Sequence, residues 1–252
     1  MRSAISGDLI RSWAVPQEFV SKCLLIRWFG GTSSGDSDKN NHSRLLLCDP
    51  QAVRIFDVQD GSWKASIDGA TGNVGQISNV CFADSPDSIL VFSDFGLKLT
   101  IWSLATGRGV EIKDPKPGET SYDLRPDTGH LALLTRNSAQ DILMIFSPSS
   151  HKLLKSVDLG TIDAQEVQWS LDGRWLAIRD TSFAGHRVQI YTADGQHFRT
   201  FSGVGDPDEI GLGIKSMSWS TSGSLILGDY NSTITLLNKT TVSIDCMMIG
   251  AS

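Results

Sequence analysis

Residues 169–195 read WSLDGRWLAIRDTSFAGHRVQIYTADG. A strand that ends in Trp169 is followed by a polar turn containing glycine and then by the apolar strand 175–178. After a second loop comes the alternating strand 188–191, which ends in a bulky residue and leads into a turn at Gly195. Glycine at such turns permits tight hairpins between antiparallel strands. The segment therefore predicts a run of short antiparallel strands.

The same pattern recurs along the chain with a period of about 45 residues. The bulky residue that ends the alternating strand recurs at separations of 46, 44, 45 and 46, in Phe56, Trp102, Phe146, Tyr191 and Leu237. The anchor of the upstream strand recurs less evenly, in Trp28, Phe82, Leu124, Trp169 and Trp219. Four short strands in about 45 residues are typical of a β-propeller blade. The repeat predicts an all-β propeller of about five four-stranded blades, with these anchors, tryptophans included, in the core.

The repeat also divides the chain into segments. Residues 1–22 are expected to form an N-terminal extension, residues 23–248 the blades, and residues 249–252 a tail. The expected blades span about 23–68, 77–114, 119–160, 163–203 and 212–248. A ring of seven such units would take about 315 residues. We therefore expect these blades to be part of a larger propeller.

An aspartate recurs near the end of the second strand of each repeat except the third. The four residues are Asp49, Asp94, Asp180 and Asp229. Aspartate readily accepts backbone hydrogen bonds in tight turns. We expect these side chains to stabilise the turn that follows.

Composition excludes several classes of function. The chain has 22 Lys and Arg against 28 Asp and Glu, a formal net charge of −6, which argues against a nucleic-acid partner. No apolar run approaches the roughly 18 residues that a membrane span needs, and residues 1–20 carry no uninterrupted apolar core of a secretory signal. The sequence predicts a cytoplasmic protein with neither a nucleic-acid nor a membrane partner.

Residues with catalytic potential are few. The segment Gly31-Thr32-Ser33-Ser34-Gly35 matches the G-x-S-x-G nucleophile elbow, but a polar stretch, residues 36–42, follows it where the elbow needs a helix. The five histidines are scattered and none has a cysteine at zinc-binding spacing. We predict no catalytic residue, metal, cofactor or small-molecule substrate, and a serine hydrolase using Ser33 is a remote alternative.

Residues 165–238 carry a resemblance to a known family. Three segments are distinctive: Val167-Gln168-Trp169-Ser170, Trp175-Leu176-Ala177, and Leu212-Gly213-Ile214-Lys215-Ser216. They resemble the WD-repeat (WD40) family, and within it the fungal members of WD repeat-containing protein eight. The resemblance implies a WD40-type β-propeller that acts as a protein-interaction scaffold rather than an enzyme.

The resemblance also implies a cellular role. Such proteins organise the mitotic spindle and anchor microtubule minus ends at the spindle pole body of fungi or the centrosome of animals. Their partners are a coiled-coil anchoring protein and a kinesin-14 motor. A WD-repeat adaptor of another complex, such as a ubiquitin ligase or a trafficking coat, is the alternative.

Candidate contact residues come from the expected loops. In the usual WD order, the turns after the middle strands and the loops between blades share one face. That face would gather residues 180–186, 206–209 and 229–232. Exposed loop residues on a rigid scaffold are common binding positions. We predict as partner contacts Arg179, Phe183, Glu209 and Tyr230.

Overall fold

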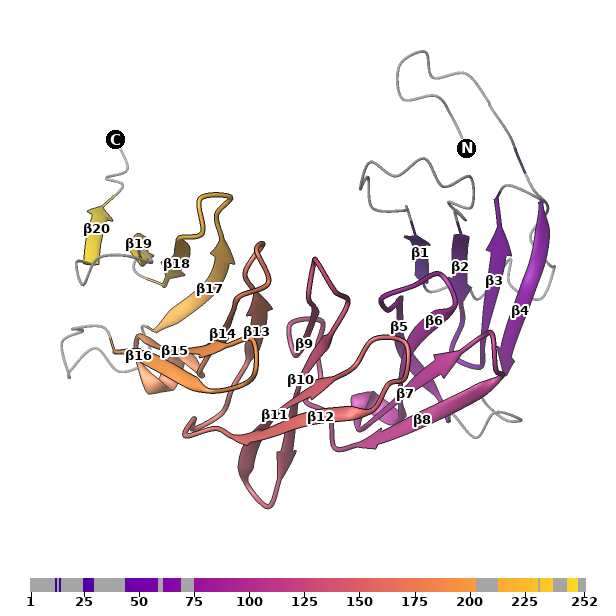
Figure 1. The fold of residues 1–252 in the computed structure, drawn as a ribbon, viewed down its shortest axis with the longest axis horizontal. Helices are drawn as coiled ribbons and strands as arrows, with labels where there is room; N and C mark the ends of the chain where they lie inside the picture. Colours follow the sequence, from indigo (N-terminus) through magenta and orange to yellow (C-terminus); the bar gives the residue numbers. More distant parts are fainter. Residues whose placement is uncertain are drawn as a thin grey trace, which may run out of the picture. The chain divides into compact units, whose positions relative to one another are not determined.

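The computed structural model describes residues 12, 14, 25–29, 44–58, 61–68, 75–202, 213–230, 232–237 and 244–248. Within these residues, the strands form five four-stranded sheets, and each strand pairs with its neighbours in the chain (Figure 1). Five successive antiparallel sheets are the arrangement of propeller blades. The prediction of an all-β, propeller-type fold is confirmed.

The sheets follow one another in chain order. The first sheet contains β1 (Leu25–Phe29), β2 (Arg44–Cys48), β3 (Ala52–Asp57) and β4 (Ser62–Asp68). The second contains β5 (Ile77–Phe82), β6 (Ser88–Ser93), β7 (Lys98–Ser103) and β8 (Arg108–Lys113). The third contains β9 (Tyr122–Leu124), β10 (Leu131–Asn137), β11 (Gln140–Phe146) and β12 (Leu153–Asp158).

The last two sheets have the same order. The fourth contains β13 (Glu166–Trp169), β14 (Trp175–Arg179), β15 (Arg187–Thr192) and β16 (His197–Ser202). The fifth contains β17 (Ile214–Trp219), β18 (Leu225–Asp229), β19 (Thr233–Leu237) and β20 (Ile244–Met248). Two short 3-10 helices follow second strands, η2 (Asp94–Gly96) and η3 (Ser182–Ala184).

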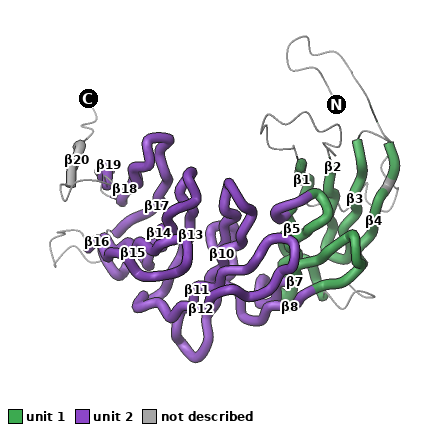
Figure 2. Tube along the Cα trace, in the orientation of Figure 1, with its two compact units in different colours: residues 1–82, 86–95, 100–109 green, residues 83–85, 96–99, 110–252 purple. Residues whose placement is uncertain are grey.

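The chain divides into two compact units (Figure 2). Unit 1 comprises residues 1–82, 86–95 and 100–109, and unit 2 comprises residues 83–85, 96–99 and 110–252. The core of unit 1 includes Leu46, Val53, Ile55, Val80 and Ile89. The core of unit 2 includes a cluster of buried residues around Trp169 and another around Met217.

Burial differs between inner and outer strands. The second strand of the second sheet, β6, is buried along its whole length, as expected for a run of Ile, Leu, Val and Phe covered on both faces. The fourth strands β8, β12 and β16 are mostly exposed. The apolar contacts of each sheet are therefore concentrated in its inner strands.

The recurring bulky residue marks a β-bulge. The pairing of the third and fourth strands shifts register at Ile55/Phe56, Ile145/Phe146 and Ile190/Tyr191. Phe56, Phe146 and Tyr191 are buried at these positions. A bulge inserts one extra residue on the facing strand and increases the local twist. The three anchors therefore lie in the core where the outer strand bends.

The first tryptophan of the repeat departs from its predicted core position. Trp28 is 46% exposed, on the same face of β1 as the exposed Ile26. The neighbouring Phe29 instead packs against the core, with its ring 5.4 Å from that of Phe82. Successive strand residues point to opposite faces, so a shift of one residue is enough to exchange the two aromatic side chains. Trp102 and Trp219 are partly buried.

Candidate functional site

Strand direction determines which loops gather at one end of each sheet. Because neighbouring strands are antiparallel, the loop between the second and third strands lies at the same end as the link to the next sheet. In unit 2 this end carries the loop after β14, the loop after β18 and the link that includes Gly213. We call the described residues 180–186, 213–215 and 229–230 the loop face.

Phe183 is the most exposed aromatic residue of the loop face. It lies in η3 and its side chain is 79% exposed. The turn is closed by backbone hydrogen bonds, from Ala184 N to Thr181 O at 2.9 Å and from Gly185 N to Ser182 O at 3.1 Å. Gly185 has a φ of +71°, a conformation that suits glycine. The backbone therefore holds this loop without help from the aromatic ring.

Tyr230 is the second exposed aromatic residue of the loop face. It directly follows β18 and is 52% exposed. Its backbone N donates to Gly213 O at 3.3 Å. Lys215 Nζ lies 5.7 Å from the ring centroid, within range of a cation–π interaction. The ring is held beside a cation and still offers an apolar surface.

The loops that carry these two aromatic residues are in contact. His186 Nε2 lies 3.1 Å from Asp229 Oδ2. A Cβ at Gly213 would lie 2.4 Å from Ser182 O and 2.7 Å from Gly185 O, so only glycine permits this close approach. The fold therefore brings the Phe183 loop and the Tyr230 loop together.

The other two predicted contacts do not lie in these loops. Arg179 is a strand residue at the end of β14, and its side chain is only 12% exposed. Its Nε donates to Glu166 Oε2 at 2.8 Å and one terminal nitrogen donates to Ile214 O at 3.1 Å. This corrects the expectation of an exposed loop residue, because Arg179 holds the fourth and fifth sheets together. Glu209 lies outside the described residues.

The recurring aspartates have different partners. Asp49 Oδ1 accepts hydrogen bonds from the backbone N of Gln51 and Ala52 in the turn that follows, both at 2.7 Å. Asp94 Oδ1 instead accepts from Gln76 N, just before the first strand of its own sheet, at 3.2 Å.

The fourth-sheet aspartate reaches mainly to the preceding link. Asp180 accepts from Ile162 N at 3.0 Å and Asp163 N at 2.9 Å, and also from Thr181 N at 2.8 Å. Asp229 faces His186 from the neighbouring loop. Asp49 thus has the expected role of stabilising the turn that follows it. Asp94 instead binds the segment before the first strand of its own sheet. Asp180 does both, because it binds the preceding link and also the next residue, Thr181.

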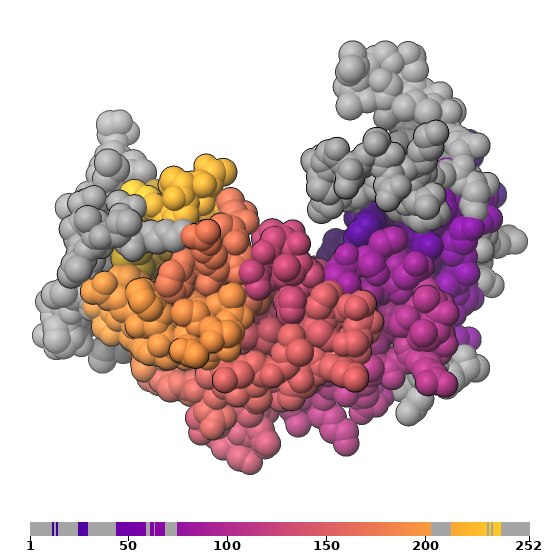
Figure 3. Space-filling view, in the orientation of Figure 1, coloured from indigo at the N-terminus to yellow at the C-terminus, as the bar shows by residue number. Residues whose placement is uncertain are grey.

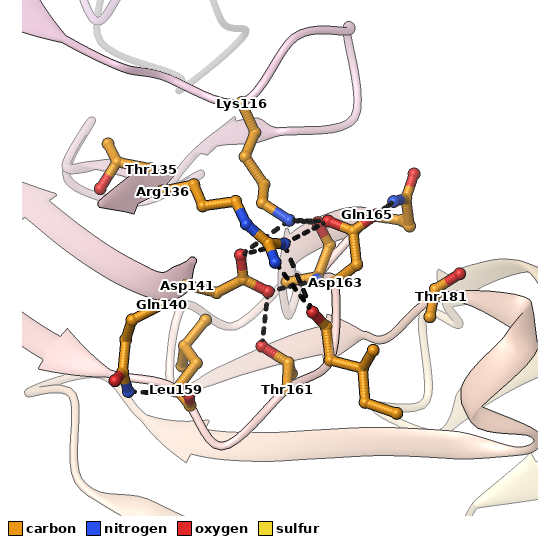
Figure 4. A network of polar contacts seen from close by, with 12 residues as sticks. Lys116, Thr135, Arg136, Gln140, Asp141, Leu159, Thr161, Asp163, Gln165 and Thr181 are labelled. Carbon is orange, nitrogen blue, oxygen red and sulfur yellow. Dashed lines mark hydrogen bonds and ion pairs between the residues drawn. The ribbon is translucent and has the colours of Figure 1, made fainter. Parts of the chain in front are cut away.

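An ionic network occupies the loop end of the third sheet, where the recurring aspartate is missing (Figure 4). Lys116 and Asp141 are buried in it, whereas the Arg136 and Asp163 side chains are 37% and 42% exposed. Lys116 Nζ lies 2.8 Å from Asp141 Oδ1, donates to Ala164 O at 2.7 Å, and also pairs with Asp163. Arg136 contacts Asp141 at 3.1 Å and Asp163 at 2.8 Å.

The network connects segments that are distant in the sequence. Asp141 belongs to β11, Lys116 to the link before the third sheet, and residues 161–164 to the link after it. Asp141 Oδ2 also accepts hydrogen bonds from Thr161 Oγ1, at 2.8 Å, and from Ala164 N. Each charged group has an oppositely charged partner, so we assign the network a structural role.

A small pocket opens beside this network. It has a volume of about 360 Å³, and its lining includes Leu97, Pro117, Lys116, Arg136 and Asp163. Among the described residues, no cluster of three His, Cys, Asp or Glu side chains could hold a metal ion. Helices long and apolar enough to cross a membrane are likewise not found in the described part of the chain. Ser33 lies outside that part.

Asp123 is a half-buried carboxylate between the third and fourth sheets. Its Oδ2 accepts from Trp169 N at 2.7 Å and its Oδ1 from Leu124 N at 2.9 Å. Burial raises its pKa from 3.8 to about 6, although these two hydrogen bonds act in the opposite direction.

Asp123 should therefore make stability depend on pH. The pKa of Asp123 is higher in the folded state than in the unfolded chain. Its carboxyl group therefore makes its full contribution to the free energy of unfolding below pH 3.8, and this contribution is lost as the pH rises through 6. When the pH is lowered from 7 to 5, the free energy of unfolding of the native chain should rise by about 1 kcal/mol more than that of the Asp123→Asn variant does. Urea unfolding at several pH values measures this difference. Equal pH slopes for the two proteins would contradict it.

The sheets, their bulges and the loop end define a propeller-type repeat protein. The chain is related in sequence to WD-repeat proteins. It is 32% identical to the WD repeat-containing protein WRAP73 of Mus musculus over 190 residues, which cover 75% of this chain and 39% of that protein. It is 26% identical to the uncharacterized WD repeat-containing protein C32H8.09 of Schizosaccharomyces pombe over 250 residues, or 97% of this chain and 49% of the relative.

The chain thus spans less than half the length of each of these curated relatives. No family model matches it. Among solved structures, the Dos1 propeller is similar with a TM-score of 0.57 and 13% identity, over 80% of this chain and 56% of that one. This likeness supports the propeller fold.

Proposed function

We propose that the protein is a protein-interaction scaffold whose loop face binds a partner protein. The observation that carries the proposal is the exposure of Phe183 and Tyr230 on two loops that contact each other. Aromatic side chains bury a large area at low entropic cost and are enriched at interface hot spots. The backbone bonds that close the Phe183 turn hold that ring in place before a partner arrives.

The loop face favours a partner with an apolar pocket and a nearby acidic group. Phe183 supplies an apolar ring without a polar atom of its own, while Tyr230 is accompanied by Lys215. A partner carboxylate could pair with Lys215 while its apolar side chains cover the rings.

We further propose that the scaffold acts at the spindle pole body or centrosome. The support for this role is the resemblance of residues 165–238 to the fungal WD repeat-containing protein eight family. On this proposal the partners are a coiled-coil anchoring protein and a kinesin-14 motor, and the protein helps to anchor microtubule minus ends. The alternative is a WD-repeat adaptor of a ubiquitin ligase or trafficking complex.

Removing the two exposed rings should weaken partner binding without unfolding the chain. The double variant Phe183→Ala/Tyr230→Ala is expected to lower co-precipitation of the coiled-coil protein at least tenfold, the effect of losing a hot spot of about 2 kcal/mol. Live imaging of the tagged protein should show a focus at the mitotic poles that the variant loses.

A matched control is Leu171→Ala, because Leu171 is as exposed as Tyr230 but lies in the β13–β14 turn at the opposite end of its sheet. Undiminished binding by the double variant would remove the loop face as the binding surface. A tagged wild-type protein without a pole focus would contradict the spindle role and favour the adaptor alternative.

A further inference from the structure

The outer strands of the third and fourth sheets carry an apolar and basic surface that contains none of the loop-face residues. At each bulge, the fourth strand has one extra residue. In the third sheet Phe146 pairs with Leu153 and Ile145 with Lys155, which leaves Leu154 as the extra residue. In the fourth sheet Tyr191 pairs with His197 and Ile190 with Arg199, which leaves Phe198.

These extra residues are large, apolar and exposed. Leu154 is 56% exposed and Phe198 is 60% exposed. The corresponding residue of the first sheet is the exposed Lys64, so the bulge itself does not require an apolar side chain. Phe198 packs against the ring of Trp175, with the centroids 4.7 Å apart, and is still 60% exposed. This contact explains part of the Phe198 side chain, but it does not explain the exposed Leu154 at the equivalent position of the preceding sheet.

The two strands form one continuous surface. A Cβ at Gly195, in the turn before β16, would lie 3.0 Å from Lys155 Cγ and 3.1 Å from Val157 Cγ2 of β12. Figure 3 shows β12 in salmon and β16 in orange on the side of the molecule that faces the viewer. We define the outer-strand patch as Leu153, Leu154, Lys155, Phe198 and Arg199.

A groove lined by both apolar and charged residues continues the outer-strand patch. It has a volume of about 350 Å³ between β8 and β11, and Leu153 belongs both to its lining and to the patch. The other apolar side chains in its lining are Ile112, Ile142, Met144 and Phe146, and the charged ones are Glu111, Lys113, Asp114 and Arg136. Small concave sites of this kind accept single large apolar side chains.

The charge of this region is opposite to that of the chain as a whole. The chain carries a formal net charge of −6. Over residues 152–158 and 194–202 the exposed charged residues are the cations Lys152, Lys155 and Arg199 and the anions Asp158 and Asp194, and Asp194 lies near enough to Lys155 for that cation to help lower its pKa. A basic surface with apolar centres is complementary to an acidic segment with apolar side chains.

We propose that the outer-strand patch is a second docking surface, which binds a partner-protein segment whose large apolar residues are flanked by Asp or Glu. Leu154, Phe198 and the groove take the apolar side chains, while Lys155 and Arg199 pair with the acids. An anionic membrane is a poorer fit, because lipid recognition uses clusters of about 4–8 basic residues, whereas residues 152–158 and 197–202 contain three lysines and arginines. The proposal extends the scaffold function but does not depend on the loop face.

A pair of designed peptides tests the proposed chemistry. The first is a fluorescein-labelled 12-residue peptide with three repeats of Glu-Leu-Asp-Phe, and the second replaces each Glu and Asp with Lys. By fluorescence anisotropy, the full chain should bind the acidic peptide at least tenfold more tightly than the basic one. Equal binding of the two peptides would overturn the proposal.

Variants of the patch locate the binding. The double variant Leu154→Ser/Phe198→Ser should weaken binding of the acidic peptide at least tenfold, whereas Leu171→Ser, at an exposed leucine outside the patch, should leave it unchanged. The charge reversal Lys155→Glu/Arg199→Glu should invert the preference, so that the basic peptide binds more tightly. Because both residues are exposed, this variant stays informative even if the serine variant is destabilised.

Two further measurements separate the other outcomes. Phe183→Ala/Tyr230→Ala should bind the acidic peptide as the wild type does, so failure of the loop face and failure of the patch can be distinguished. Vesicles of 30% phosphatidylserine in phosphatidylcholine should not retain the protein. Patch-dependent retention on vesicles, or unchanged preference in the charge-reversal variant, would overturn the proposed protein partner.

Discussion

The Asp141→Ala variant should lose about 3–5 kcal/mol of the free energy of unfolding. The substitution removes the fully buried carboxylate that lies 2.8 Å from the buried Lys116 ammonium. Asp141 is fully buried and accepts hydrogen bonds from Thr161 Oγ1 and Ala164 N in addition to its ion pairs. Asp163, the other ionic partner of Lys116, is 42% exposed and is shared with Arg136, so it compensates the buried ammonium only in part. Urea unfolding followed by circular dichroism measures the loss.

Two further variants make this result interpretable. Asp158→Ala removes an exposed aspartate of the same sheet and should change the free energy of unfolding by less than about 0.5 kcal/mol. Adding Lys116→Met to Asp141→Ala should recover part of the loss, since the buried ammonium that would be left with the half-exposed Asp163 as its only carboxylate partner is removed as well. If Asp141→Ala costs no more than Asp158→Ala, the network does not stabilise the third sheet.

The repeat in the sequence predicted the fold because its strongest signal coincides with a physical requirement. The bulky residues Phe56, Phe146 and Tyr191 occupy buried positions at a β-bulge, where the outer strand bends. A buried side chain at a bend that recurs in the first, third and fourth sheets must recur in the sequence at multiples of the length of one blade. The period therefore identified the blades.

The ionic network could not be predicted from the same repeat. Its members Lys116, Asp141 and Asp163 belong to three separate segments, and the third repeat lacks the aspartate that the other repeats share. One signal was available, namely the aspartate next to the apolar run Ile142 to Phe146. A charged residue in an apolar strand requires a partner when buried, but sequence spacing alone does not identify that partner.

The candidate partner contacts were chosen because they were expected in exposed loops. Phe183 and Tyr230 are indeed exposed loop residues. Arg179 differs because it precedes the loop by one residue and still belongs to β14, where Glu166 and the Ile214 carbonyl face it. The end of a strand is uncertain by one or two residues from sequence, and at this position one residue separates an internal ion pair from an exposed turn.

Trp169→Ala should cost about 3–5 kcal/mol, whereas Trp28→Ala should cost less than about 1 kcal/mol. The two tryptophans hold corresponding positions in the repeat, but Trp169 is 3% exposed and packs in the core of unit 2, while Trp28 faces solvent. Truncating Trp169 removes its core contacts and leaves a cavity. Urea unfolding of the whole chain, monitored by circular dichroism, measures both variants.

Trp169→Phe separates packing from hydrogen bonding. Trp169 Nε1 is buried without a hydrogen-bond partner among the described residues, so phenylalanine gives up volume but no hydrogen bond. The expected cost is about 1–1.5 kcal/mol, well below that of alanine. Similar losses for Trp169→Ala and Trp28→Ala would mean that the repeat position, rather than burial, determines the energetic role of the residue. A large difference would show instead that burial within each sheet determines which copy of the repeat stabilises the fold.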